Sequence, residues 1–203
     1  SDAIDSPWPA LAIGCGRQSI PFMRAIRKAS ARANGGHTIT VQCQHPRVNP
    51  ALFDLVVPPQ HDRLTGPNVL PLLGSPNRIS PAALEKARAH FAPLLEKIRS
   101  PRIAVLLGGR NKAYQFGREE TETLAHMLSA LTPDYGLMIT PSRRTEAENL
   151  AIIGKALEAG DAMIWNGKGE NPYLGLIAWA DAFIVTADSV NMACEAAATG
   201  KPV

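Results

Sequence analysis

The stretch DAFIVTADSVNMACEAAATGKPV, residues 181–203, carries the clearest fold signal in the sequence, because it passes from a predicted strand into a predicted helix. Residues 182–185 are apolar and rich in β-branched and aromatic side chains, which predicts a buried strand. A helix is predicted over residues 190–199, with Asp188 and Ser189 both good N-cap residues before it and Gly200 directly after it. This order is typical of half a βαβ unit.

The start of this helix is a candidate ligand site. In a parallel sheet it would lie at the carboxyl end of a strand, where ligands bind, and helix N-termini favour anions such as phosphate. Glu195 lies four residues after Asn191, on the same helix face. A phosphate near Ser189 and a ribose held by the Glu195 carboxylate would suit a nucleotide. The alternative is a plain βαβ unit in which Glu195 faces water.

The composition is that of a globular α/β protein. The chain has 203 residues, 45% of them hydrophobic and 19% charged, so it could form one large domain or two compact ones. No apolar run is long enough to cross a bilayer, and no signal-like segment opens the sequence. Strands expected at both ends lack neighbours, so we expect a sheet cut at both ends and a chain that is part of a longer protein.

The cysteine content and the net charge of the chain limit which ligands and partners are expected. Cys15, Cys43 and Cys194 are odd in number and far apart, and we expect them to be reduced and buried, without a disulfide framework or a metal site. The formal charge of +3 favours an anionic substrate or membrane surface and gives no reason to expect nucleic acid. A cytoplasmic protein is the corresponding expectation.

The first half predicts a short βα series. Strands are expected at residues 10–15, 37–42, 55–57 and 68–72, and helices at residues 22–32 and 81–97. The helix at residues 22–32 should follow Ser19 as its cap and pack through Phe22, Ile26 and Ala29. Its opposite side carries four basic residues, Arg24, Arg27, Lys28 and Arg32. That side is interpreted as a solvated face, with contact to a membrane or a partner as the alternative.

A linker is predicted at residues 99–102, which divides the chain into an N-terminal domain of residues 1–98 and a C-terminal domain of residues 99–203. In the second half, strands are expected at residues 103–107, 137–140, 162–165 and 182–185. Helices should lie between and after them, one starting from a capping box at residues 145–148. This alternation predicts a parallel sheet flanked by helices.

Three strand ends of the second half point to anion chemistry. Gly108 and Gly109 would let a backbone approach a ligand closely, with Arg110 and Lys112 beside them. Arg143 lies in a Ser-Arg-Arg turn after the next strand and suits bidentate phosphate binding. The helix start at Ser189 is the third. Each could be only a turn or a solvated side chain, but three at one sheet edge favour a nucleotide.

Polar residues also follow the strands of the first half. They are Arg17, Gln44, Arg47, His61 and Asp62, and we expect them to face the second half across a cleft. His61, beside Asp62, is a candidate general base, because histidine titrates near neutral pH. A structural loop histidine is the alternative. The chain has no GxSxG, HExxH, Walker A, CxxC or GxGxxG motif, which argues against hydrolase, zinc-protease, P-loop and standard NAD sites.

Several stretches together resemble the mitochondrial-fission ELM-type family, which is related to GT-B glycosyltransferases and has been labelled a predicted nucleoside-diphosphate-sugar epimerase. They are GRQS (16–19), VQCQHPRVNPALFDLVVPPQHD (41–62), TGPNVL (65–70), LLGGRNKAYQFG (106–117), TPSRRT (140–145), GENPY (169–173) and TADSVNMACEAAATGKPV (186–203). The resemblance spans residues 11–203. Asn191 departs from the Ser expected there, and an early βα unit and C-terminal helices are missing.

The resemblance implies two Rossmann-like domains that face each other across a cleft, as in GT-B enzymes. The second would bind a nucleotide-sugar: Glu195 the ribose, Ser189 with Gly108 and Gly109 the diphosphate, and Arg143 the phosphate charge. The loop with Asn166 and Gly167 would lie near the base. The first domain would bind the acceptor, through residues that include Arg17, Ser19, Gln44 and Arg47.

The expected activity is glycosyl transfer to a bacterial envelope glycoconjugate, with the nucleotide-sugar as substrate and with no metal and no permanently bound cofactor. His61 or Asp62 would deprotonate the acceptor, while the helix dipole and arginine stabilise the leaving diphosphate. One alternative is a nucleoside-diphosphate-sugar epimerase of the same architecture. The other is a non-catalytic scaffold at the inner face of the cytoplasmic membrane, with Arg24, Arg27 and Lys28 as its contact surface.

Overall fold

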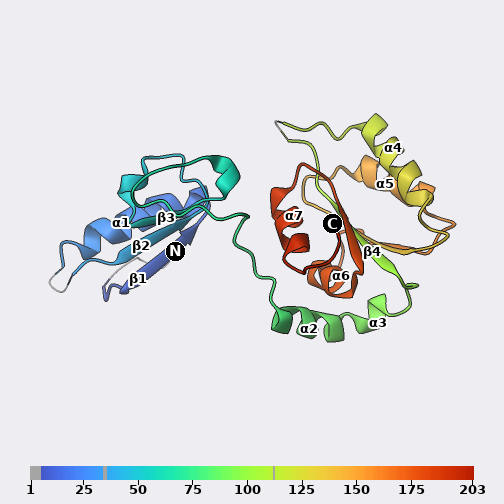
Figure 1. Cartoon of the computed structure of the whole chain (residues 1–203), viewed down its shortest axis with the longest axis horizontal. Coiled ribbons are helices and arrows are strands. Elements are labelled where there is room, and N and C mark those ends of the chain that lie inside the picture. The colour runs from blue at the N-terminus through green and yellow to red at the C-terminus, as the bar shows by residue number, and fades with distance from the viewer. Residues whose placement is uncertain (1–5, 34–35, 112) are drawn as a thin grey trace. The chain divides into compact units, whose positions relative to one another are not determined.

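A computed structural model describes residues 6–33, 36–111 and 113–203 (Figure 1). The chain divides into two compact units, the first ending at Pro76 and the second beginning at Asn77. Each unit contains a purely parallel sheet with helices packed against it. The predicted α/β class, with parallel sheets flanked by helices, is therefore confirmed.

The first unit is built on three parallel strands in the order β1-β2-β3. The strands are β1 (Leu11–Cys15), β2 (Ile39–Cys43) and β3 (Leu55–Val57), and the helix between the first two is α1 (Ile20–Ser30). The fourth strand predicted at residues 68–72 is wrong, because only isolated bridges join Val69 to Val56 and Leu72 to Pro59. Pro71 has no backbone N–H, so a regular ladder cannot continue through this segment.

Helix α1 packs on one face of this sheet through Ile20 and Met23, which meet Phe53 and Val56 in a small core. The prediction that Phe22 faces the sheet is wrong, since its side chain is 57% exposed. The helix starts at Ile20, directly after the predicted cap position Ser19, and the inward positions recur from there with helical spacing.

The opposite face of the first sheet is open to solvent. Gly14 faces α1, because a Cβ added to it would meet Met23. Side chains alternate between the two faces of a strand, so Leu11 and Ile13 point away from α1. Their exposed fractions are 50% and 65%. Cys15 is also exposed, and Cys43 and Cys194 are only partly buried, which corrects the expectation of buried cysteines.

The second unit contains a four-stranded parallel sheet in the order β6-β5-β4-β7. Its strands are β4 (Arg102–Leu107), β5 (Gly136–Pro141), β6 (Ala162–Ile164) and β7 (Ala182–Val185). Its helices are α2 (Pro81–His90), α3 (Ala92–Leu95), α4 (Arg118–Ser129), α5 (Ala147–Ala156), α6 (Tyr173–Trp179) and α7 (Val190–Ala197). The predicted strand and helix alternation is confirmed here.

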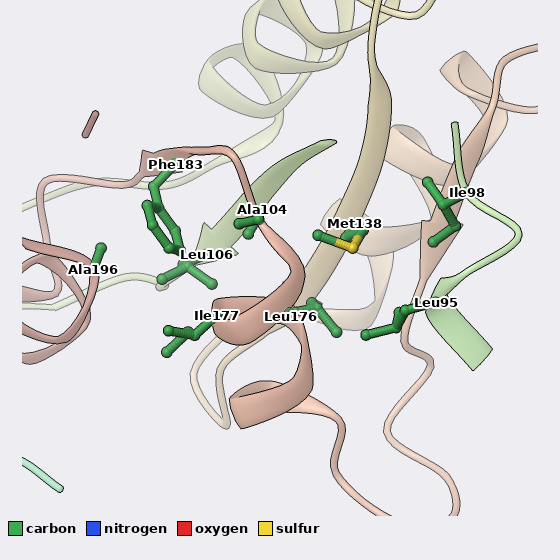
Figure 2. Packing of buried hydrophobic residues seen from close by; sticks show 10 residues of the cluster. Leu95, Ile98, Ala104, Leu106, Met138, Leu176, Ile177, Phe183 and Ala196 are labelled. Atoms are coloured by element: carbon green, nitrogen blue, oxygen red, sulfur yellow. The ribbon is translucent and has the colours of Figure 1, made fainter. Parts of the chain in front are cut away.

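Helices cover both faces of this sheet, which explains why β4 is almost continuously apolar. On one face Ala104 and Leu106 pack with residues of α3, α6 and α7 (Figure 2). On the other face Ile103 and Val105 pack with residues of α4 and α5. Figure 1 shows α4 and α5 on the side of the sheet away from α2, α3 and α6.

The division at Pro76 differs from the domain boundary predicted between residues 98 and 99. Leu95 and Ile98 are buried in the same core as Leu176 of α6, so the helical segment before residue 99 belongs to the second unit. The single helix predicted over residues 81–97 is also wrong, because it is interrupted at Phe91. Pro93 explains the break, since it lacks an N–H and its ring would clash with the carbonyl of the preceding turn.

Candidate functional site

The strand order of the second unit creates a switch point between β4 and β7. The chain passes from β4 to β5 on one side of β4, and later places β7 on the other side. In open parallel sheets the crevice beyond the carboxyl ends of such strands is the usual ligand site. The loops that begin at Gly108, Ser142 and Thr186 meet there.

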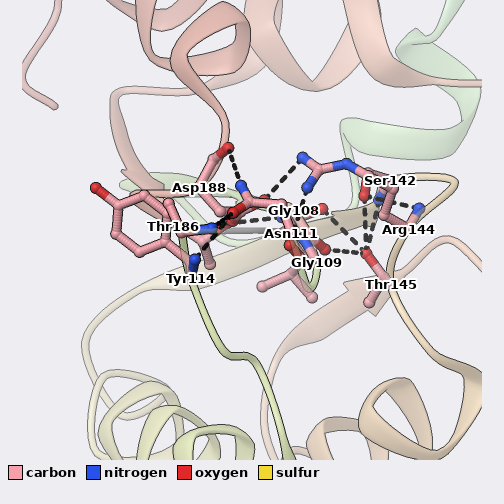
Figure 3. Close-up of polar contacts among 11 residues, drawn as sticks. Gly108, Gly109, Asn111, Tyr114, Ser142, Arg144, Thr145, Thr186 and Asp188 are labelled. Atoms are coloured by element: carbon pink, nitrogen blue, oxygen red, sulfur yellow. Dashed lines mark hydrogen bonds and ion pairs between the residues drawn. The ribbon is translucent and has the colours of Figure 1, made fainter.

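The carboxylate of Asp188, an almost fully buried side chain, lies among these three loops (Figure 3). It accepts hydrogen bonds from the Gly109 N–H at 2.9 Å and from the Thr186 hydroxyl at 2.7 Å. Arg144 donates to the same carboxylate at 2.7 Å, and only 4% of the Asp188 side chain is exposed. We call Asp188, Arg144, Thr186 and Gly109 the Asp188 cluster. It joins the loops after β4, β5 and β7.

The cluster keeps Asp188 ionised. Burial by itself would raise the pKa of its carboxyl group, but hydrogen bonds from Thr186 and Gly109 and the charge of Arg144 hold that pKa below its usual value. A carboxylate that receives charge-assisted hydrogen bonds of this kind is strongly fixed in place. Asp188 is therefore a fixed negative charge between the loops that follow β4, β5 and β7.

The glycine pair is required by the packing of these loops. A Cβ on Gly108 would collide with the Asp188 carboxylate, and one on Gly109 with the Arg144 carbonyl. The Gly108 N–H donates to the Thr186 hydroxyl at 2.7 Å, so both glycine N–H groups already have acceptors in the protein. A diphosphate at this turn would have to replace the contacts with Thr186 and Asp188.

The capping box predicted at residues 145–148 is wrong. Glu146 is the N-cap residue of α5, and its side chain makes no capping hydrogen bond. The Thr145 hydroxyl donates to the Leu107 carbonyl at 3.1 Å and accepts from the Ser142 N–H at 2.9 Å. Because this hydroxyl joins the ends of β4 and β5, it is not available to cap the helix.

A cavity of about 730 Å³ opens beside the Asp188 cluster, at the carboxyl ends of β5 and β6 and the starts of α6 and α7. Three residues predicted to bind the nucleotide-sugar line it together, namely Arg143, Gly167 and Ser189. Trp165 and Tyr173 supply aromatic surface to the same walls. We call this space the α7 cavity. Its arginine, backbone and aromatic groups match the chemistry of a nucleotide.

The first turn of α7 forms part of this wall through Ser189 and Met192. Ser189 is the N-cap residue, as predicted, but its side chain accepts no hydrogen bond from that turn. The first N–H groups of a helix have no partner within it, so they need an acceptor from outside. A phosphate oxygen in the cavity would be such an acceptor.

Glu195 is held by a tyrosine that the sequence did not single out. The Tyr173 hydroxyl, which stands at the start of α6, donates a hydrogen bond to Oε2 of Glu195. Burial, and then the hydrogen bond and charge of Glu195, raise the pKa of Tyr173 well above its usual value, so its phenol stays protonated. Tyr173 thus fixes one carboxylate oxygen and leaves Oε1 for another donor.

The loop after β6 is ordered by its own polar groups. The Asn166 side chain accepts from the Lys168 N–H at 3.0 Å, and the Trp165 indole donates to the Lys168 carbonyl at 3.0 Å. Gly167 has a φ of 81°, a conformation that favours glycine. Gly167 reaches the α7 cavity, whereas Asn166 is exposed and shapes the loop.

Arg110 lies on a different surface. It lines a cavity of about 770 Å³ together with Tyr114, on the other side of Arg144. Lys112, predicted to act beside it, lies outside the described residues.

The first unit brings its predicted residues to one sheet edge. Because β1, β2 and β3 are parallel, the segments after them share the carboxyl edge. These segments contain Arg17, Ser19, Gln44, Arg47, His61 and Asp62. Ser19 donates to the Gly16 carbonyl at 2.8 Å and the Gln42 side chain at 3.1 Å, so its hydroxyl joins two strand ends and does not cap α1.

His61 and Asp62 lie in a short 3-10 helix after β3, with His61 exposed and Asp62 partly buried. In the described part of the chain no hydrogen bond joins their side chains. Gln44 and Arg47 have positive φ angles of 70° and 58°, which is unusual for residues other than glycine. Such backbone conformations often mark functional loops.

Two further findings concern residues 6–33, 36–111 and 113–203. They contain no group of three or more His, Cys, Asp and Glu side chains placed to hold a metal ion. No helix formed by them has both the length and the apolar character needed to cross a membrane. Sequence reasoning missed Tyr173 as the partner of Glu195. It named Arg144 beside Arg143 and Asp188 as a possible N-cap residue, but it did not foresee the ion pair that joins them.

The comparisons with known proteins agree with one another. A family model described as "Mitochondrial fission ELM1" matches residues 1–203. The "Mitochondrial fission protein ELM1" of Arabidopsis thaliana is 32% identical over 222 residues, which cover 96% of this chain and 51% of that protein. The "Uncharacterized protein RP120" of Rickettsia prowazekii (strain Madrid E) is 32% identical over 154 residues, covering 71% of this chain and 42% of that protein. The chain therefore spans about half, or less, of the length of these relatives.

Proposed function

The chain belongs to the mitochondrial fission ELM1 family, and from its α7 cavity we propose that it binds a nucleoside diphosphate sugar and takes part in glycosyl transfer. The observation that carries this proposal is that Arg143, Ser189 and Tyr173 line one cavity at one sheet edge, and that Tyr173 donates to Glu195, which lies outside the lining. Each group suits a different part of such a ligand.

The diphosphate would lie between Arg143 and the first turn of α7. Arginine binds phosphate oxygens in a bidentate manner, and the N–H groups at the helix start supply further donors. The free oxygen of Glu195 would accept from a ribose hydroxyl, with Tyr173 fixing the carboxylate. Trp165 and Gly167 would flank the base.

In the transfer step, the acceptor hydroxyl oxygen would form a bond to the anomeric carbon of the sugar. The bond from that carbon to the diphosphate oxygen would break, and the nucleoside diphosphate would leave with the electron pair. The Arg143 guanidinium and the α7 start would stabilise its charge. His61 or Asp62 would take the proton of the acceptor hydroxyl. An epimerase would use the same donor site without an acceptor.

One observation favours a second candidate, a non-catalytic scaffold. Asp188 fills the crevice at the β4–β7 switch point, and the Arabidopsis relative is named for mitochondrial fission. If the crevice serves only to hold the loops together, the unit needs no nucleotide. This reading predicts that the folded protein binds none.

A thermal-shift panel of UDP-, GDP-, ADP-, CMP- and dTDP-sugars separates the two candidates. A ligand that binds only the folded protein adds about 2.7 kcal/mol of stability at a hundredfold excess over its Kd. We expect one nucleotide to raise the melting temperature of the wild type and to lose this effect in Arg143→Ala and Glu195→Ala. The matched control is Arg118→Ala, an exposed arginine of α4, which should keep it.

A melting temperature that no member of the panel changes would reject nucleotide binding and support the scaffold. A shift that survives both Arg143→Ala and Glu195→Ala would place the nucleotide outside the α7 cavity. Conversion of the bound donor without an acceptor would identify the epimerase.

A further inference from the structure

The formal charge of the chain is concentrated in its first unit. Residues 1–76 contain seven of the 21 Lys and Arg residues but only four of the 18 Asp and Glu residues. Residues 77–203 contain fourteen of each, so they are balanced. Between residues 6 and 53 there is no Asp or Glu, although this stretch contains six Lys and Arg residues. Such an asymmetry indicates an anionic partner for the first unit.

The positive charge gathers around a groove on α1. A groove of about 630 Å³ lies between α1 and the segments around His37 and Leu52. Arg24, Arg27 and Lys28 line it from the helix. Its remaining lining is largely apolar, with Pro21 and Leu52 as the larger side chains. The groove therefore combines a cationic rim with an apolar wall.

The cations of this groove are not all equivalent. Arg27 donates to Asp54 at 2.8 Å and to the Ala51 carbonyl at 3.2 Å, so it is used within the unit. His37 also lies 3.6 Å from the Asp54 carboxylate. Arg24 and Lys28 are exposed, and in the described part of the first unit neither forms an ion pair. These two side chains have charge available for a ligand.

An exposed aromatic side chain lies on the same helix, outside the lining of the groove. Phe22 follows Pro21 on α1 and is 57% exposed, although it is a large apolar residue, and the same helix carries Arg24 and Lys28. Basic side chains combined with an exposed aromatic ring on one helix are typical of segments that lie at a membrane surface. A groove that recognised nucleic acid would be expected to present aromatic or amide side chains to the bases. This one offers Pro21 and Leu52 instead.

We propose that the α1 groove is a docking surface for anionic phospholipid membranes. The lipid phosphate would lie between Arg24 and Lys28, and the apolar wall that contains Pro21 and Leu52 would contact the glycerol and upper acyl region. The site lies within the first unit and uses no residue of the α7 cavity. Lipid docking and nucleotide binding can thus succeed or fail separately.

Vesicle flotation of the full chain tests this docking. We expect the protein to float with vesicles that contain phosphatidylglycerol and to stay in solution with pure phosphatidylcholine vesicles. Arg24→Glu combined with Lys28→Glu should weaken binding at least about tenfold, because the charges near the lipid surface are reversed. Phe22→Ser should weaken it less. The charge-matched control, Lys97→Glu with Lys155→Glu on the second unit, should float like the wild type.

Three results would overturn the proposal. The first is a failure to float with phosphatidylglycerol, and the second is an equal loss of flotation in the control pair. The third is binding to soluble glycerol phosphate or to a short DNA duplex as strong as binding to vesicles, since the groove would then recognise phosphate in general. Circular dichroism of each variant verifies folding. The nucleotide thermal shift of the groove variants should be unchanged, which separates this test from that of the α7 cavity.

Discussion

Arg144 and Asp188 form an ion pair of 2.7 Å across 44 residues of sequence, and it ties the loop after β5 to the loop after β7. The same arginine donates to the Gly109 carbonyl at 2.9 Å, so the loop after β4 is included. The loops that follow three neighbouring strands are therefore joined by one arginine and one aspartate. This arrangement positions Arg143 and Ser189, the neighbours of the two paired residues, at the α7 cavity.

Replacing Asp188 should destabilise the second unit. Asp188→Ala leaves the Gly109 N–H and the Thr186 hydroxyl without their acceptor and Arg144 without its partner. We expect the free energy of unfolding to fall by about 2–4 kcal/mol, the range for a buried charged group with several hydrogen bonds. Urea denaturation at neutral pH measures it. Lys155→Ala, an exposed change on α5, should remain within about 0.5 kcal/mol of the wild type. If Asp188→Ala changed the free energy of unfolding as little as Lys155→Ala, the stabilising role of the Asp188 cluster would be contradicted.

Acid should weaken the protein through Asp188 and Asp54. The folded-state pKa of both carboxyl groups is lowered, Asp54 by hydrogen bonds from Thr40 and the charge of Arg27 acting against burial. Their stabilisation is complete above the unfolded pKa of about 3.9 and is lost as the pH falls from there through the lowered values. Asp188→Asn should therefore show a shallower loss of stability below about pH 4.5 than the wild type. Parallel acid profiles of the two proteins would contradict this.

A methyl group added at the Gly108–Gly109 turn should lower the stability of the second unit. Gly109→Ala places a Cβ against the Arg144 carbonyl, and overpacking of this kind lowers stability by about 1–3 kcal/mol. Gly154→Ala within helix α5 is the matched control, because the nearest atom to its added Cβ is Cδ1 of Ile164 in β6, at an ordinary contact distance of 3.9 Å. It should raise stability by about 0.5–1 kcal/mol, since alanine favours helix. Both values come from urea denaturation, and the same sign for both changes would argue against the packing described.

The Tyr173 phenol should resist ionisation. Burial and Glu195 raise its pKa far above the usual value of about 10, so it should not form phenolate there while the protein stays folded. The difference in absorbance at alkaline pH between the wild type and Tyr173→Phe isolates this residue. Phenolate in the difference spectrum near pH 10, with circular dichroism unchanged, would show that Tyr173 does not donate to Glu195.

The open face of the first sheet should bind a hydrophobic dye. Leu11, Ile13 and Ile39 are at least half exposed on that face, and exposed apolar patches of this kind bind dyes or other proteins. Ile13→Thr should reduce the fluorescence of bound anilinonaphthalene sulfonate. Met127→Thr, which changes a 61% exposed side chain on α4, should leave it nearly unchanged. Equal effects of the two changes would locate the dye elsewhere.

The alternation of strands and helices was predictable because each element has its own local pattern. The apolar run before Gly108 and the cap and glycine around α7 are short-range signals, and the strand ends they define meet at one sheet edge. This also explains why Arg143, Gly167 and Ser189, predicted separately, line one cavity.

The errors arise where one local signal has two structural outcomes. Residues 99–102 are polar and contain a proline, as a linker would, but Ile98 beside them is buried. Thr145 begins a sequence that is typical of a helix capping box, yet its hydroxyl group joins the ends of two strands. The hydrogen bond between Tyr173 and Glu195 depends on how α6 and α7 are placed in the fold, and this placement cannot be inferred from the spacing of residues in the sequence.

Hydrogen–deuterium exchange with the nucleotide-sugar that gives the largest thermal shift tests the central claim most directly. If the α7 cavity is the donor site, the ligand should slow exchange at the start of α7, at residues 142–144 and at residues 165–167, and leave β1 to β3 unchanged. The same ligand should produce no protection in Arg143→Ala. Protection confined to other segments, or none with any nucleotide-sugar, would contradict the assignment of the α7 cavity.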